Sequence, residues 1–142
     1  MSAGHQLCCR ELCADDRYQI RASMSRWIAD PSVDVVITSG GTGLTGRDGS
    51  PEAIGPLLDK TMDGFGELFR VLSFETIGTS TLQSRCLAGV ANGTFVFVLP
   101  GSLDAVTTAW DRLIAAQLDQ ETRPCNLAQI RTRLKESANH PA

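Results

Sequence analysis

Residues 35–53 read VVITSGGTGLTGRDGSPEA, a β-branched run that passes through a glycine-rich loop into a helix start signal. The apolar beginning predicts a short strand over residues 33–38, of the kind that is covered on both faces. At the other end, Ser50 is interpreted as a helix N-cap, Pro51 as the first helical residue and Glu52 as negative charge in the first turn. The stretch therefore predicts a strand, a loop and a helix in series.

The loop inside this stretch is the first candidate site. A flexible loop between a strand end and a helix N-terminus presents backbone N–H groups, which favours an anion site, usually for phosphate. We expect the N–H groups of residues 40–43 and the helix start at residues 50–51 to hold the anion. Asp48 lies beside them and would repel an anion if it stayed unpaired, so it indicates a divalent metal ion.

Length and composition indicate one domain over residues 1–142 with a real hydrophobic core. Hydrophobic residues make up 42% of the chain and the net charge is -3, as in a soluble globular protein. A mildly acidic chain without interleaved aromatic and basic residues is a poor candidate for nucleic-acid binding. No long apolar run or signal-peptide pattern is present, so we expect a cytoplasmic protein without a membrane span.

The chain has five cysteines, namely Cys8, Cys9, Cys13, Cys86 and Cys125. Their odd number and the lack of a Cys-x-x-Cys pair argue against a disulfide framework or a zinc knuckle. Cys8, Cys9 and Cys13 could form a redox or metal cluster, but we favour small hydrophobic side chains in a reduced protein.

Apolar spacing and cap residues predict the remaining elements. Helices are expected over residues 15–29, from 51 to about 63, directly after residue 64, from 103 and from 126. Residues 86–99 are predicted to form a hairpin around Asn92-Gly93, because Asn-Gly is the strongest short hairpin signal. Ser102 is interpreted as the N-cap of the helix that follows.

Strands that alternate with helices favour an α/β fold. We predict a three-layer sandwich with a mainly parallel sheet flanked by helices and an antiparallel hairpin at one edge. Ligands of such sheets bind beyond the carboxyl ends of the strands. The turns at residues 40–43 and 100–102 both follow a strand, so they are expected to face the same crevice.

The glycine loop has three other interpretations. Residues 41–46 fit the dinucleotide pattern G-x-G-x-x-G, but the helix starts only at residue 50, too late for that motif. Residues 41–48 approach a P-loop, although Arg47 replaces its lysine and Asp48 its Ser/Thr. The third interpretation is a turn that binds nothing. His5 and His140 lie near the chain ends, so chemistry without imidazole, such as phosphoryl or nucleotidyl transfer, is favoured.

Several motifs together resemble the molybdopterin-binding MoaB/MogA family. They are Ile37 to Gly43, Arg47 to Ala53, Gly64-Phe65-Gly66-Glu67, Leu82-Gln83-Ser84-Arg85 and Leu99-Pro100-Gly101-Ser102. The run from Arg70 to Arg85 and the tail Thr122 to Asn126 resemble the MoaB branch in particular. The resemblance covers nearly all of the chain.

The resemblance implies an α/β sandwich that assembles as a homotrimer or homohexamer and takes part in molybdenum cofactor biosynthesis. It implies molybdopterin and ATP as ligands, with Mg²⁺, in adenylylation of molybdopterin; other enzymes of the pathway are possible partners. Asp48 and Asp15 match the two essential aspartates of the family, and Asp48 is also the expected metal ligand. Ser84 aligns with a serine tied to pterin binding. The expected substrate-binding set is Gly40, Gly41, Thr42, Gly43, Ser50, Pro51, Glu52, Ser84, Pro100, Gly101 and Ser102.

Residues 2–5 resemble the end of the first helix of the family. The family's first strand and its Asp-Thr-Ser-Gly turn are therefore expected to be missing, and we predict a natural start about 30 residues upstream, enough for one strand and one helix.

The function favoured at this point is adenylyl transfer from Mg-ATP to the terminal phosphate of molybdopterin. That phosphate is already ionised near neutral pH, so the reaction needs two anions held in line rather than a general base. Arg47 and Arg85 could assist, or could be a solvated loop residue and a surface ion pair. The alternatives are a non-catalytic pterin-binding or assembly protein of the same pathway and an ordinary nucleotide-binding module.

Overall fold

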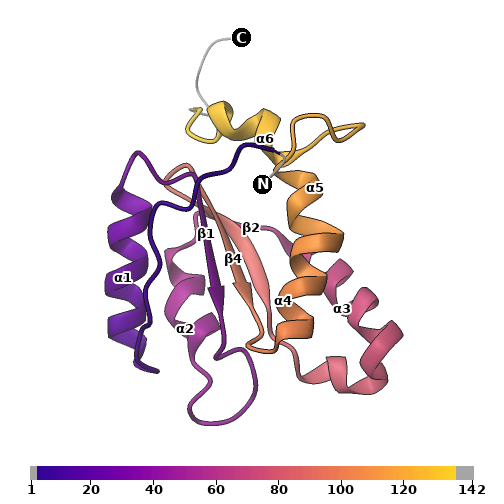
Figure 1. Ribbon diagram of the computed structural model, residues 1–142. Helices are drawn as coiled ribbons and strands as arrows, with labels where there is room; N and C mark the ends of the chain where they lie inside the picture. The colour runs from indigo at the N-terminus through magenta and orange to yellow at the C-terminus, as the bar shows by residue number, and fades with distance from the viewer. Residues whose placement is uncertain (1–2, 137–142) are drawn as a thin grey trace.

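The computed structural model describes residues 3–136, which form an α/β sandwich of three layers (Figure 1). The sheet consists of β1 (Val35–Ser39), β2 (Lys60–Thr61), β3 (Leu87–Ala91) and β4 (Thr94–Leu99) in the order β1-β4-β3-β2. β1 pairs in parallel with β4, whereas β3 pairs antiparallel with both β4 and β2. Every residue of β4 is buried, because this strand lies inside the sheet with a layer on each side.

The first helical layer covers one face of the sheet. It contains α1 (Arg17–Ala29) and α2 (Ser50–Ile54), which continues into the 3-10 turn η1 (Gly55–Leu57). The buried residues that this layer shares with the sheet include Met24, Ile54 and Val96. Asp16 begins α1 as its N-cap, since its carboxylate accepts hydrogen bonds from the two backbone amides of residues 18 and 19.

The second helical layer covers the opposite face. It contains α3 (Asp63–Ile77), the 3-10 segment η2 (Gly78–Gln83), α4 (Leu103–Ala109), the π-helical turn η3 (Trp110–Ile114) and α5 (Ala115–Gln117). Phe65 and Phe69 of α3 stack on each other, and Phe65 meets Phe97 of β4 edge to face. α6 (Leu127–Ile130) and the turn η4 (Arg131–Arg133) lie across the end of the sheet where β1 and β4 begin (Figure 1).

The predicted α/β class and its flanking helices are confirmed, and the strand pairing differs in detail. Within residues 3–136 the sheet is mixed, with one parallel pairing and two antiparallel ones. The hairpin lies inside this sheet instead of at its edge, because the short β2 adds itself to β3. The helix predicted from residue 51 to about 63 ends at Leu57 for the same reason, since residues 60–61 enter the sheet.

Local signals located the other elements well. Asn92 and Gly93 both have positive φ, at 49° and 81°, as the predicted two-residue hairpin turn requires. Ser102 caps α4 by accepting a hydrogen bond from the Ala105 amide, and Asn126 caps α6 in the same way. No helix within the described residues is long and apolar enough to cross a membrane.

Candidate functional site

The two glycine turns lie side by side where β1 and β4 end, at the lower end of the molecule in Figure 1. The Gly40 amide donates a hydrogen bond to the Leu99 carbonyl at 2.9 Å. The Ser39 hydroxyl donates to the Pro100 carbonyl at 3.2 Å. A Cβ on Gly101 would lie 3.3 Å from the Cα of Gly40. The expected juxtaposition of the turns is therefore present, because parallel strands end at the same edge of the sheet.

Ser50 holds the beginning of the loop in place. Its buried hydroxyl donates a hydrogen bond to the Gly40 carbonyl at 2.8 Å, and its amide donates to the Gly41 carbonyl. The predictions of Ser50 as N-cap and Pro51 as first helical residue are each wrong by one position: Gly49 is the N-cap, Ser50 is the first residue of α2 and Pro51 is the second. The reason is that the Ser50 hydroxyl serves the glycine loop instead of the helix amides. Gly41, with φ of +71°, packs against this hydroxyl where no side chain would fit.

Both turns contain backbone amides that have no hydrogen-bond acceptor among the described residues. Within residues 3–136, the N–H groups of Gly41 and Thr42 have no hydrogen-bond acceptor, and the same holds for Gly101 and Ser102. Thr42 is buried, whereas Gly101 and Ser102 are exposed. Unpaired amides of this kind are the groups that bind phosphate oxygens in glycine-rich loops.

Asp48 is held in a defined orientation by Thr45. The Thr45 amide and hydroxyl donate to Oδ2 of Asp48 at 3.0 and 2.7 Å. These hydrogen bonds lower the pKa of Asp48 below its usual value of 3.8, and the charge of Arg85 adds to the effect. Both Thr45 hydrogen bonds fall on Oδ2, and the Gly43 amide also helps to lower the pKa of Asp48. The carboxylate is therefore ionised at neutral pH.

Asp15 reaches the same loop through Arg47. The Arg47 guanidinium lies 3.1 Å from Oδ2 of Asp15, although 86% of the arginine side chain and 53% of the aspartate side chain are exposed. Asp15 is not the cap of α1, since that role falls to Asp16. The structure thus places Asp15 beside the loop and leaves its carboxylate accessible to solvent.

Glu52 and Ser84 contribute two buried polar atoms without a partner. Oε2 of Glu52 and the hydroxyl of Ser84 receive or donate no hydrogen bond within the described residues. The other oxygen of Glu52 pairs with Arg85, which lowers the pKa of this carboxyl. Buried polar atoms are nearly always satisfied, so atoms left open beside a pair of glycine turns favour a ligand there. Pro51 is half-buried in the first turn of α2.

Sequence reasoning missed the residues that arrange this loop. Thr45 stands three residues before Asp48, the spacing at which a threonine and an acidic residue bond reciprocally, so this signal was available. Arg85 was named without its partners, and Arg21 was not named at all. Arg21 donates hydrogen bonds to the carbonyls of Glu52 and Ala53, both at 2.9 Å, and so fixes α2 onto α1. No local pattern indicates contacts across 31 and 32 residues.

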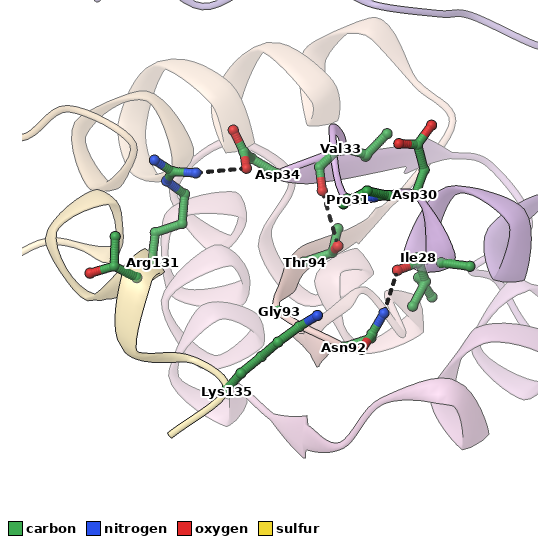
Figure 2. Close-up of a pocket in the computed structure, with 12 residues that line it drawn as sticks. Ile28, Asp30, Pro31, Val33, Asp34, Asn92, Gly93, Thr94, Arg131 and Lys135 are labelled. Carbon is green, nitrogen blue, oxygen red and sulfur yellow. Dashed lines mark hydrogen bonds and ion pairs between the residues drawn. The ribbon is translucent and has the colours of Figure 1, made fainter. Parts of the chain in front are cut away.

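Two cavities lie at the opposite end of the sheet. One, of about 230 Å³, lies between the end of α1, the hairpin turn and the segment of Arg131 and Lys135 (Figure 2). Its polar side chains are largely bound to the protein itself: Arg131 pairs with Asp34 at 2.9 Å, and Asn92 donates to the Ile28 carbonyl. The other, of about 530 Å³, lies between the N-terminal segment and residues 118–121. Neither includes a residue of the glycine turns.

The cysteines do not form a centre. Cys8, Cys9 and Cys13 are free and exposed. Within residues 3–136, no group of three or more His, Cys, Asp or Glu side chains is arranged to hold a metal ion. Cys86 is buried between α3 and the sheet, and burial raises the pKa of its thiol. Ser2 and His140 lie outside the described residues.

Comparison of the chain with known proteins identifies its family. A family described as a probable molybdopterin binding domain matches residues 1–120. Molybdenum cofactor biosynthesis protein B of Escherichia coli K12 is 57% identical over 124 residues, which cover 87% of this chain and 73% of that protein. The protein of the same name from Staphylococcus carnosus is 46% identical over 106 residues, 74% of this chain and 62% of that protein.

Solved structures give the same result. The crystal structure of a molybdenum cofactor biosynthesis protein B superimposes with a TM-score of 0.81 at 38% identity, covering 93% of this chain and 77% of that one. The tungsten cofactor synthesizing protein MoaB from Pyrococcus furiosus gives a TM-score of 0.70 at 35% identity, covering 86% and 71%. The chain therefore belongs to the molybdopterin-binding family as a MoaB-type protein, and its role lies in molybdenum cofactor biosynthesis.

Proposed function

We propose that the protein binds molybdopterin and transfers an adenylyl group to it from Mg-ATP. In this reaction a terminal phosphate oxygen of molybdopterin attacks the α-phosphorus of ATP. The bond from this phosphorus to the oxygen that bridges to the β-phosphate breaks, and pyrophosphate leaves. The observation that carries the proposal is the contact between the two glycine turns, where the Gly40 amide donates to the Leu99 carbonyl at 2.9 Å and the Ser39 hydroxyl donates to the Pro100 carbonyl at 3.2 Å. This contact brings two sets of uncommitted amides together, as a reaction between two phosphates requires.

Backbone amides are the groups proposed to hold the phosphates. Those of Gly41 and Thr42 suit one phosphate, and those of Gly101 and Ser102 suit the other. Gly40 and Gly43 give the backbone the room to approach, because neither adds a side chain to the loop. The amides are fixed before the substrates arrive, so they stabilise developing charge without reorganisation.

Asp48 is the proposed ligand for Mg²⁺. Its carboxylate is ionised and accepts both Thr45 hydrogen bonds on Oδ2, which favours Oδ1 as the ligand of a hard cation. Mg²⁺ commonly takes one or two carboxylates and completes its shell with water and substrate phosphates, so a larger protein cluster is not needed. When bound, the metal would neutralise charge on the phosphates. Asp15 is the proposed second acidic group, held beside the loop by Arg47.

Ser84 is the proposed contact to the pterin. Its hydroxyl is buried and has no partner in the described chain, and it precedes the arginine that contacts the glycine loop. A hydroxyl of this kind can both donate and accept, which suits the mixed donor and acceptor edge of a pterin. Glu52 offers a second open oxygen on the same side of the loop.

A non-catalytic pterin-binding or assembly protein of the same pathway is the second candidate. The observation that favours it is the ion pair between Asp15 and Arg47. In this pair the arginine binds one of the two carboxylates that are expected to be catalytic. In that case the amides and Ser84 would bind the pterin while ATP turnover would be absent.

A homotrimer or homohexamer in the cytoplasm is the proposed working form. Four apolar side chains at helical spacing along α3 are more than half exposed, namely Leu68, Val71, Phe74 and Ile77. An apolar stripe of this size is typical of a surface that another chain covers. A second copy is the expected partner, and other enzymes of the pathway are further candidates.

The test of the proposal is Asp48→Asn. The amide keeps the size of the side chain but removes the negative charge, so we expect turnover to fall roughly a hundredfold or more. Molybdopterin affinity should stay within about twofold, because the backbone amides are unchanged. Pyrophosphate release and pterin fluorescence titration measure the two quantities separately. Wild-type turnover in the variant would rule out the metal-binding role of Asp48.

A further inference from the structure

We infer that Arg85 is a positioning residue that sets the shape of the glycine loop and so orients Asp48. This inference rests on the proposed function of the loop and deepens it. Arg85 lies between η2 and β3, and β4 separates β3 from β1 in the sheet. Its contacts nevertheless reach the loop that follows β1 and the first turn of α2.

The contacts of Arg85 span the whole loop. Its amide donates to the Thr42 carbonyl at 3.0 Å, and its Nε donates to the Gly43 carbonyl at 2.8 Å. Its Nη2 donates to the Asp48 carbonyl at 3.2 Å. Its Nη1 pairs with Oε1 of Glu52, in the first turn of α2. One side chain therefore ties together both ends of the loop and the helix that follows.

The loop has few other supports over this span. Thr45 and Asp48 bond to each other, which closes the tip of the loop but does not attach it to the rest of the protein. Leu44 is exposed and Arg47 is almost fully exposed. The Arg47–Asp15 ion pair also links this span to the rest of the protein, but both of its side chains are more than half exposed, and exposed ion pairs contribute little. Arg85, with 30% of its side chain exposed, is therefore the main support of residues 43–48. The conformation of a loop that is held mainly by one guanidinium depends on the fixed directions of the N–H donors of that group.

Arg85 is also the neighbour of Ser84 in the chain. The proposed pterin contact and the support of the proposed metal-binding loop are therefore adjacent residues in the chain. Any shift of this segment moves the Gly43 and Asp48 carbonyls with it, because the guanidinium bonds to both. In this proposal Arg85 does not contact the reacting atoms, and it acts by positioning Asp48.

The test compares Arg85→Lys with Arg131→Lys. Lysine keeps the charge but cannot make the three side-chain contacts at once. Arg131 pairs with Asp34 at the opposite end of the sheet, so its variant is the matched control. In Arg85→Lys we expect amide hydrogen exchange in residues 42–49 to rise about tenfold, with the rest of the chain unchanged. We also expect Mn²⁺ affinity in the presence of ATP, measured by EPR, to fall about tenfold, and pterin affinity to change less than twofold.

Glu52→Gln is the second variant, for use if Arg85→Lys fails to fold. It removes the ion pair and leaves the carbonyl contacts, so a smaller rise of exchange in the same residues is expected. Exchange and Mn²⁺ affinity that match those of the Arg131→Lys control would overturn the inference, as would a rise spread over the whole chain. Both readouts work without turnover. Absent pyrophosphate release in the wild type would therefore count against the proposed function alone.

Discussion

Gly41→Ala should destabilise the protein by an amount that the loop geometry allows us to work out. Gly41 has φ of +71°, where a non-glycine residue costs about 1–2 kcal/mol. An added Cβ would also overlap the Ser50 hydroxyl, and moving it would break the 2.8 Å hydrogen bond to Gly40, a loss of about 0.5–1.5 kcal/mol. Alanine lowers the entropy of the unfolded chain, which offsets about 0.5 kcal/mol. The net expectation is a loss of about 2 kcal/mol.

The free energy of unfolding is measured by urea titration and Tm by a thermal melt, both monitored by circular dichroism at one fixed protein concentration. A loss of about 2 kcal/mol corresponds to a fall in Tm of about 4–8 °C for a chain of this size. Gly46→Ala is the matched control: it lies in the same loop, and a Cβ there would meet no atom within 4 Å. We expect the control to stay within about 0.5 kcal/mol of the wild type. Equal free energies of unfolding for the two variants would refute the role of Gly41 and Ser50 in shaping the loop.

Three further predictions follow from the same geometry. Gly101→Val should weaken pterin binding about tenfold, the effect of about one lost hydrogen bond, because its side chain would crowd Gly40; an unchanged dissociation constant would contradict this. Thr45→Val should raise the Asp48 pKa toward 3.8, as measured by carbon-detected NMR titration. A lowered carboxyl pKa stabilises the fold at pH values above the ordinary pKa of the group, and this stabilisation is lost as the pH falls through the pKa of the folded state. The variant has less of it, so it should lose less stability on acidification than the wild type. Phe74→Asp on the exposed α3 stripe should lower the mass in analytical ultracentrifugation. Leu12→Asp, at a residue that is even more exposed but lies outside the stripe, should not.

Local chemistry explains which parts of the fold could be predicted from the sequence. The hairpin followed from Asn92-Gly93, because both residues tolerate the positive φ that the turn needs. The start of α4 followed from Ser102, whose hydroxyl bonds only three residues ahead. β2 could not be predicted, since two residues carry no periodic pattern and pair only because β3 is beside them.

The candidate site shows the same limit. Asp48 was found because it stands directly in the glycine loop, and the meeting of the two turns followed from the rule for parallel strands. The role of Ser50 was missed, because its partner Gly40 is ten residues away and competes with the helix amides for its hydroxyl. The side-chain contacts of Arg85 cross 33 to 42 residues, so only the folded chain brings them together.

Pyrophosphate release from ATP and molybdopterin tests the central proposal most directly. The purified protein is mixed with both substrates and Mg²⁺, and a coupled phosphate assay records product over time, with the Asp48→Asn variant as the control. We predict steady release that needs both substrates and the metal and that is lost in the variant. Tight pterin binding without release, or release that the variant retains, would contradict the adenylyl-transfer function.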